Sequence, residues 1–202
     1  KQSHVASYRK ITDMIRSNGA LPAIQLGHSG RKGSCHDAMR DWRALNNSDA
    51  ENDLPPWQVM TPTAALSPPR PIPHKEMDQD DINRVVDDFR TATKRSIDAG
   101  YDIVEIHGAH GYLIHQFLSA TSNQRKDNYG GSLANRMRFA VEVAAAVREV
   151  WPKERPVFFR LSAVDGKGGS WTLADSISLA ATLREVGIDM IDVSSGGITG
   201  SS

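Results

Sequence analysis

Two histidines and a tyrosine stand close together near the middle of the chain, just after a run of apolar residues. His107, His110 and Tyr112 are spaced by Gly108 and Gly111 in the segment HGAHGY. Polar side chains just past the end of a buried strand must be matched to a ligand or to one another. These three residues are therefore the candidate site.

Two other interpretations of the histidine pair are open at this point. The spacing His107-x-x-His110 is compatible with two metal ligands, but a zinc site needs at least a third, and no Cys or Asp stands at a suitable spacing. We therefore predict no metal. The pair also fits two buried histidines that bond only to the backbone.

Four apolar runs predict the strands that position this site, and helical patterns separate them. The predicted strands cover residues 20–26, 103–106, 156–161 and 188–193. The predicted helices cover residues 5–15, 78–97, 132–147 and 172–183, with capping residues Asp78, Asp81, Ser132, Thr172 and Asp175. This alternation, with nearly continuous apolar strands, predicts an α/β protein with a parallel sheet covered by helices.

Two architectures build such a sheet, the doubly wound open sheet and the (β/α)8 TIM barrel. The first predicted strand is not followed by G-x-G-x-x-G, which disfavours the dinucleotide-binding open sheet. With long loops set aside, the strand spacing fits the roughly 30 residues per unit of a barrel. Since four strands cannot close a barrel, the chain is expected to cover about the central four strand–helix units. Residues 1–202 are thus predicted to be part of a single TIM-barrel domain.

Polar residues end each predicted strand. They are Gln25, His107, Arg160 and Ser194. In a barrel, residues from the C-terminal ends of different strands converge on the site. An arginine there needs an anionic or electron-rich partner, although Arg160 is also compatible with neutralising only Glu105 or Asp192.

Two segments lack regular periodicity and are predicted to be loops. Residues 34–77 are interpreted as a long excursion that packs on the protein through Trp42, Trp57 and Leu66. The stretch between Tyr112 and Tyr129 is interpreted as a functional loop, because loops of that length are uncommon inside compact domains.

Composition excludes several classes of partner. Lys+Arg and Asp+Glu both number 24, so there is no electrostatic case for nucleic acid or an anionic membrane. The single cysteine, Cys35, excludes an internal disulfide framework and fits a reducing compartment. No apolar run approaches the length of a membrane span. A cytoplasmic location is therefore expected.

Several ordered motifs extend across nearly the whole chain. They are Gln25–Lys32 (QLGHSGRK), Glu105–Leu113 (EIHGAHGYL), Phe117–Ser119, Asn123-x-Arg125-x-Asp127-x-Tyr129-Gly130-Gly131-Ser132, Asn135-Arg136-x-Arg138-Phe139, Arg160–Ser162 and Asp192–Gly196. On these motifs, the sequence resembles the Old Yellow Enzyme family of FMN-dependent NAD(P)H oxidoreductases. Classical members carry Asn at the position of His110, so the chain resembles the branch that includes bacterial and thermophilic enzymes and xenobiotic reductases.

The resemblance implies a (β/α)8 barrel with FMN at its C-terminal mouth. Gln25 and Arg160 would contact the pyrimidine edge of the flavin, since an amide donates and accepts at once and a fixed cation favours the reduced flavin anion. His107 and His110 would bind the carbonyl oxygen of the substrate and stabilise the developing enolate. Tyr112 would supply a proton.

The function implied is that of an ene-reductase. NAD(P)H would reduce FMN, and the flavin N5 would then transfer hydride to the β-carbon of an α,β-unsaturated carbonyl compound. The expected substrates are small enones or quinones, and a homo-oligomer is expected. The alternatives are a dienoyl-CoA reductase-like relative with an iron–sulfur cluster, a non-catalytic flavin-binding barrel and a structural half-barrel.

Overall fold

The main feature of the computed structural model, which describes residues 1–66 and 71–198, is a parallel sheet. Within those residues the strand order is β1-β4-β5-β6, and every neighbouring pair is parallel. The strands are β1 (Ala23–Leu26), β4 (Ile103–Gly108), β5 (Val157–Ser162) and β6 (Met190–Ser194). The four predicted strands and their parallel arrangement are therefore confirmed.

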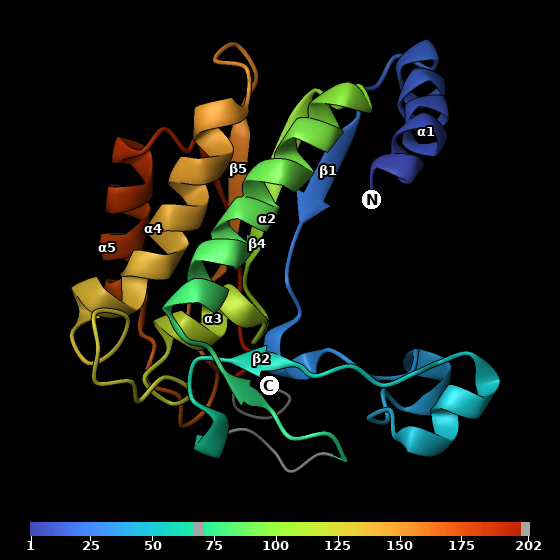
Figure 1. Cartoon of the computed structure of the whole chain (residues 1–202). Helices are drawn as coiled ribbons and strands as arrows, with labels where there is room; N and C mark the ends of the chain where they lie inside the picture. The colour runs from blue at the N-terminus through green and yellow to red at the C-terminus, as the bar shows by residue number, and fades with distance from the viewer. Residues whose placement is uncertain (67–70, 199–202) are drawn as a thin grey trace.

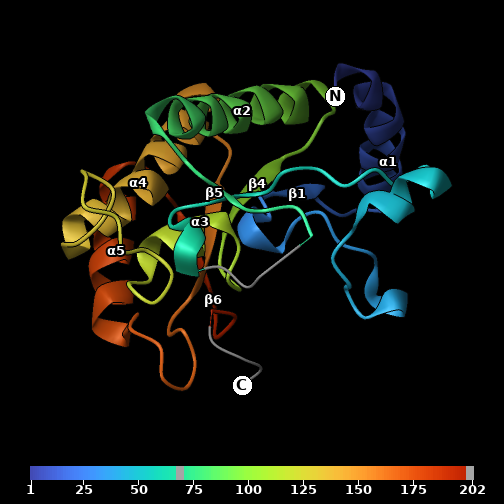
Figure 2. The same cartoon turned by 60° about the horizontal axis from the view of Figure 1, so that its bottom comes forward.

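Helices cover one face of this sheet. The helices of the described residues are α1 (Val5–Ser17), α2 (Gln79–Asp98), α3 (Leu113–Leu118), α4 (Leu133–Val150) and α5 (Leu173–Glu185). Helices α2, α4 and α5 lie side by side over the strands (Figure 1), and from the other view they form an arc around them (Figure 2). None of the helices in the described ranges combines the length and the apolarity needed to cross a membrane.

The predicted helix starts are confirmed by their capping hydrogen bonds. Asp78 accepts from the backbone N–H of Asp81 at 2.8 Å, and the Asp81 carboxylate accepts in return from the N–H of Asp78. Thr172 and Asp175 repeat this reciprocal pattern at the start of α5. Ser132 accepts from the N–H three residues ahead of it in α4. These caps satisfy N–H groups that have no partner inside the helix.

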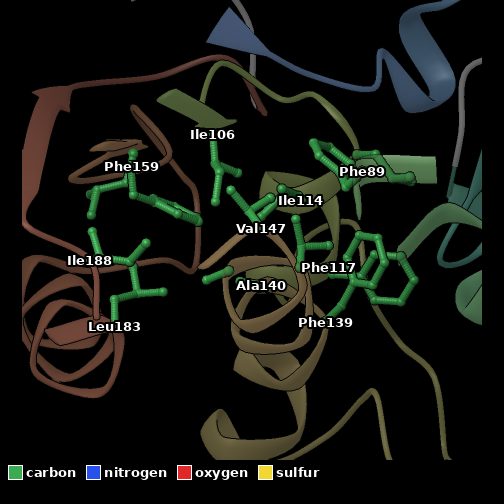
Figure 3. Close-up of a cluster of buried hydrophobic side chains, with 14 of the residues drawn as sticks. Phe89, Ile106, Ile114, Phe117, Phe139, Ala140, Val147, Phe159, Leu183 and Ile188 are labelled. Carbon is green, nitrogen blue, oxygen red and sulfur yellow. The ribbon is translucent and has the colours of Figure 1, made fainter. Parts of the chain in front are cut away.

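The core lies between the sheet and the helices (Figure 3). Alternate residues of β4 and β5 face the helices, and α4 supplies the opposing layer. The buried side chains of these three elements include Val104, Ile106, Phe159, Leu161, Phe139, Ala140, Val143 and Val147. This apolar layer fixes the strands, and therefore the polar residues at their ends.

The other face of the sheet carries the polar residues in two rows. Gln25 is in register with Glu105, one row deeper than His107, whose register partner is Arg160. Arg160 in turn is in register with Asp192. Since register partners in a parallel sheet point to the same side, the side chains of each row face the same space.

The excursion does not pack as its tryptophans suggested. Trp42 is 64% exposed and Trp57 is 54% exposed, whereas Leu45 and Val59 are buried. A buried carboxylate, Asp49, instead organises part of the segment through hydrogen bonds from neighbouring side chains. The prediction for the two tryptophans was wrong because an apolar side chain is buried only where other residues pack against it, and the sequence does not show which residues those are. Residues 67–70 of the excursion lie outside the described residues.

Shorter elements complete this part of the chain. Strands β2 (Met60–Thr61) and β3 (Lys75–Glu76) pair in parallel with each other. Short 3-10 helices lie at Gln2–His4, Gly30–Lys32, Ala38–Arg40, Asn47–Asn52 and Ala64–Leu66.

The segment after Tyr112 is not a continuous loop, because it contains α3. All six residues of α3 are buried, so the helix has no polar face. A helix that is buried all round shows no amphipathic period, which is why the sequence pattern missed it. Figure 1 shows α3 at the end of the sheet where the strands terminate.

We expect Phe139→Ala to lower the free energy of unfolding by about 3–5 kcal/mol, because a fully buried aromatic ring leaves a cavity when truncated. Ile177→Ala on α5 is the matched control, since Ile177 is 63% exposed and should change stability by less than about 0.5 kcal/mol. Urea unfolding followed by circular dichroism measures both. Equal effects would show that α4 does not carry the core.

Candidate functional site

The three predicted site residues come together at the end of β4. The ring of His107 contacts those of His110 and Tyr112 edge-on, with centroid distances of 5.1 and 5.0 Å. His107 is 9% exposed, whereas His110 and Tyr112 are half-buried. The spacing in the sequence thus produces one cluster of two imidazoles and a phenol that is open on one side.

A line of hydrogen-bonding atoms runs through the two imidazoles. The backbone N–H of Ala109 donates to Nδ1 of His107 at 3.3 Å. Nε2 of His107 lies 3.4 Å from Nδ1 of His110, and Nε2 of His110 lies 2.6 Å from Oγ of Ser194. Because Nδ1 of His107 accepts, its ring proton is on Nε2 and points toward His110.

Both imidazoles are held in the neutral form. Burial, together with the neighbouring His110 and the Arg160 cation, lowers the pKa of His107 to about 4. Burial and Arg160 likewise lower the pKa of His110. At neutral pH each ring therefore carries one N–H donor and no charge.

His110 adopts a left-handed backbone conformation, with φ of +57°. This region is unfavourable for residues other than glycine and persists only where surrounding contacts enforce it. Here Lys32 Nζ donates to the carbonyl oxygen of His110 at 2.7 Å, and Ser162 Oγ accepts from its N–H at 3.0 Å. The strained turn aims the His110 ring at β6.

The loops after β1, β4 and β6 are tied together at this turn. Lys32 Nζ also donates to the carbonyl of Gly197 at 2.9 Å. Ser162 Oγ donates to the carbonyl of Gly196 at 2.8 Å. Gly111 lies so near the β6 loop that a Cβ there would be 2.0 Å from the Gly197 oxygen. The site is therefore built on close backbone contact between loops far apart in the sequence.

Tyr112 is fixed by its backbone and ring while its hydroxyl is available. It is the N-cap residue of α3, and its ring lies against His107 and 5.5 Å from the ammonium of Lys32. Among the described residues, no hydrogen-bond partner is found for the phenolic oxygen. A positioned hydroxyl of this kind can act on a ligand held by the imidazoles.

Gln25 and Arg160 lie on the same face of the sheet but in different rows. Nε2 of Gln25 donates to the carboxylate of Glu105. Nε of Arg160 forms a 3.2 Å ion pair with Asp192. The direction of this contact makes no hydrogen bond, so Nε is a buried donor without an acceptor in the described part of the chain. Arg160 thus neutralises Asp192, but its Nε donor still has no hydrogen-bond acceptor among the described residues.

The sequence analysis missed a buried pair beneath the site. His115 on α3 and Asp165, in the loop after β5, both have side chains with no exposure, and Nε2 lies 2.8 Å from Oδ1. Nδ1 of His115 accepts from the N–H of Gly111 at 2.9 Å. The proton is therefore on Nε2 and donates to Asp165. A histidine within the apolar run of α3 was the available signal, since a buried polar group must be satisfied.

Asp165 connects two loops through its carboxylate. Its Oδ2 accepts from the hydroxyl of Ser119 at 2.6 Å and from the N–H groups of Ser170 and Trp171 at 2.8 and 2.9 Å. Burial raises the pKa of Asp165, but the hydrogen bonds from His115, Ser119 and Trp171 lower it by more. The carboxylate therefore stays ionised and fully bonded.

The polar motif that follows α3, Asn123-x-Arg125, forms hydrogen bonds to the backbone of neighbouring segments. It is therefore not a set of polar side chains that only face water. Asn123 is buried and donates to the carbonyls of Phe117 and Tyr129, both at 2.7 Å. The Arg125 guanidinium donates to the carbonyl of Met77 at 2.6 Å. These contacts fix the connection between α3 and α4.

The metal interpretation of the histidine pair has no third ligand. In residues 1–66 and 71–198, no group of three or more His, Cys, Asp or Glu side chains is arranged to hold a metal ion.

Sequence comparison relates the chain to flavin enzymes. The profile of the NADH:flavin oxidoreductase / NADH oxidase family matches residues 1–200. An NADPH dehydrogenase of Geobacillus sp. (strain WCH70) is 39% identical over 195 residues, which are 96% of this chain and 51% of that protein. An NADH:flavin oxidoreductase of Gibberella zeae is 38% identical, with coverage of 98% and 50%. The chain spans about half the length of the curated relatives it matches.

Solved structures give the same relation. 2-Naphthoyl-CoA reductase in complex with 2-naphthoyl-CoA superposes with a TM-score of 0.80 at 30% identity, covering 97% of this chain and 29% of that one. An old yellow enzyme homologue from Zymomonas mobilis gives 0.75 at 28% identity, with coverage of 98% and 54%. These superpositions confirm the predicted fold class, a TIM barrel of which the sheet is a part.

The low pKa of His107 predicts a loss of stability in mild acid. The unfolded chain protonates this imidazole near pH 6.5, whereas the folded protein does so only near pH 4. The free energy of unfolding should therefore fall by about 2 kcal/mol between pH 7 and pH 5 through His107 alone. Urea unfolding of the wild type and of His107→Gln at both pH values isolates this contribution. The same pH dependence in both proteins would contradict the assignment.

We expect Asp165→Asn to cost about 3 kcal/mol or more, because an amide would face N–H and O–H donors on all sides in a buried place. Asp87→Asn on α2 is the control, since its carboxylate is exposed and pairs with Arg90 on the same helix. Chemical denaturation compares the two. A cost for Asp165→Asn as small as that of the control would show that water compensates at this site.

Proposed function

Because the chain belongs to the NADH:flavin oxidoreductase / NADH oxidase family, the Old Yellow Enzyme family, we propose that the protein reduces the C=C bond of α,β-unsaturated carbonyl compounds with FMN and NAD(P)H. One observation carries the proposal. Two neutral imidazoles present facing nitrogens 3.4 Å apart beside a phenol whose hydroxyl has no hydrogen-bond partner among the described residues. This is a donor pair next to a proton source.

The imidazole pair is suited to one oxygen atom. Nε2 of His107 and Nδ1 of His110 are close enough that a single oxygen can lie about 2.9 Å from both. Since the rings are neutral, they donate hydrogen bonds without protonating the oxygen. Donors fixed in advance at a carbonyl oxygen stabilise the negative charge that develops there during reduction.

The residues of the two polar rows fit a flavin. In the described part of the chain Arg160 has a buried Nε donor without an acceptor, and the Gln25 amide donates to Glu105 and can also accept. These two side chains would hold the pyrimidine edge of the ring system. When bound, FMN supplies a hydride obtained from NAD(P)H to the β-carbon of the substrate.

Tyr112 is the proposed proton donor. Saturation of the double bond needs a proton at the α-carbon, and a phenol can supply it as a general acid. The contact of its ring with His107 keeps the hydroxyl beside the atoms that hold the carbonyl oxygen.

A dienoyl-CoA reductase-like enzyme with an iron–sulfur cluster is the second candidate. It is supported by the similarity to 2-naphthoyl-CoA reductase, whose structure contains 2-naphthoyl-CoA. Iron analysis of the purified protein discriminates, because an iron–sulfur cluster is expected of a dienoyl-CoA reductase-like relative and not of a simple ene-reductase.

Tyr112→Phe tests the proposed function in the purified flavoprotein. The substitution keeps the ring on His107 and removes the hydroxyl, so flavin reduction by NAD(P)H should persist. Reoxidation by an enone such as 2-cyclohexenone should slow by about 100-fold or more, the range for one acid–base group. Stopped-flow absorbance measures both half-reactions.

Tyr8→Phe on α1 is the matched control, because its ring is half-exposed and distant in the chain from the site. Both of its half-reactions should match the wild type. Equal loss of both half-reactions in Tyr112→Phe would assign Tyr112 to positioning. A wild-type protein that binds no FMN would overturn the proposed function.

A further inference from the structure

Ser194, the last residue of β6, contacts the imidazole pair from the side opposite to His107. Its Oγ lies 2.6 Å from Nε2 of His110 and does not belong to the proposed catalytic group. Ser194 is in register with Ser162, which binds the backbone of the same histidine. Two neighbouring strands thus each end in a hydroxyl that contacts His110.

The hydroxyl can pair with either tautomer of His110, in one case as acceptor and in the other as donor. A serine hydroxyl can donate or accept. When Nε2–H of His110 donates to Ser194, Nδ1 is free to accept from Nε2–H of His107, and the two rings satisfy each other. When Ser194 donates to Nε2, the proton of His110 is on Nδ1, and the two ring N–H groups face the same space.

The second arrangement needs an acceptor between the rings. Two N–H donors 3.4 Å apart repel unless an oxygen accepts from both. In His107, the N–H of Ala109 already fixes the proton on Nε2. The state of the pair therefore depends on His110 alone, and the partner found for Nε2 of His110 in the described part of the chain is Ser194.

We propose that Ser194 is a positioning residue that sets His110 in the Nδ1–H tautomer when a substrate oxygen binds, by turning its hydroxyl from acceptor to donor. The inference rests on the proposed function, because it takes the imidazole pair to be the oxygen site. The ring loses a proton to water at Nε2 and gains one from water at Nδ1. Neither its charge nor its number of protons changes.

The arrangement explains how the pair is satisfied in both states. Without an oxygen ligand, His107 donates to His110 and His110 donates to Ser194, so no donor is left unused. With an oxygen ligand, the rotation of one hydroxyl releases both ring donors, and no side chain needs to move. Removal of the hydroxyl takes away the donor to Nε2 that supports the Nδ1–H form, so the ligand is expected to find one donor fewer.

The test uses the FMN-loaded protein with 4-hydroxybenzaldehyde as an oxygen ligand. Flavin absorbance gives its affinity, and nitrogen-15 NMR of labelled histidine gives the tautomer of His110. We expect Nδ1–H in the ligand-bound wild type and Nε2–H in Ser194→Ala, with about 10-fold weaker binding, the cost of one hydrogen bond to a polarised oxygen.

Three further variants make the result specific. Ser194→Thr retains a hydroxyl and should restore affinity and tautomer. Ser194→Cys offers only a weak donor and should resemble Ser194→Ala, which keeps the test valid if the alanine variant does not fold. Ser195→Ala removes a neighbouring exposed hydroxyl and should match the wild type.

The outcomes separate this inference from the proposed function. Wild-type affinity and an unchanged tautomer in Ser194→Ala would overturn the role of Ser194 and leave the oxygen site standing. Failure of the wild type to bind 4-hydroxybenzaldehyde would overturn both. Equal loss of affinity in Ser194→Ala and Ser194→Thr would also overturn it, because a general packing role would then account for the effect.

Discussion

The buried carboxylate of Asp165 is the contact on which the geometry of the site depends. A charge with no exposure to water is tolerated only when hydrogen bonds replace its hydration, and here His115, Ser119 and two backbone N–H groups do so. Some of these donors come from α3 and the residue after it, and the others come from the loop after β5. The carboxylate therefore fixes α3 relative to the sheet. His115 in turn accepts from the N–H of Gly111, which sets the turn between His110 and Tyr112.

From this base the site is assembled mainly through backbone atoms. Lys32 and Ser162 bind carbonyl and amide groups of the loops after β4 and β6, and they hold His110 in its left-handed conformation. The side chains of His107, His110 and Tyr112 contribute little to holding the loops together. Within the described residues the facing nitrogens of the two imidazoles bond only to each other, so both can turn to a ligand, which agrees with sites built on rigid elements with a supporting shell.

The parts that the sequence could predict are those encoded locally. Apolar runs and capping residues predicted the strands and helices, because alternation and N-capping are properties of neighbouring residues. His107, His110 and Tyr112 were found because polar residues stood just after a strand. The position of Gln25 one row deeper depends on strand register, and register depends on packing across the sheet. The hydrogen bond between His115 and Asp165 could not be predicted for a similar reason. The two residues are far apart in the chain, and α3 has no polar face that would indicate a helix.

The contact between Gly111 and Gly197 also limits how a site of this kind can be diversified. A methyl group on Gly111 would fall 2.0 Å from the Gly197 oxygen, and one on Gly197 would fall 2.3 Å from the carbonyl carbon of His110. Neither loop can therefore accept a side chain at its point of contact unless the other loop moves away. A library aimed at new substrates would lose every member altered at these two positions. Substitutions that change the substrate have to be made in loops that approach the imidazole pair but do not take part in the contact between Gly111 and Gly197.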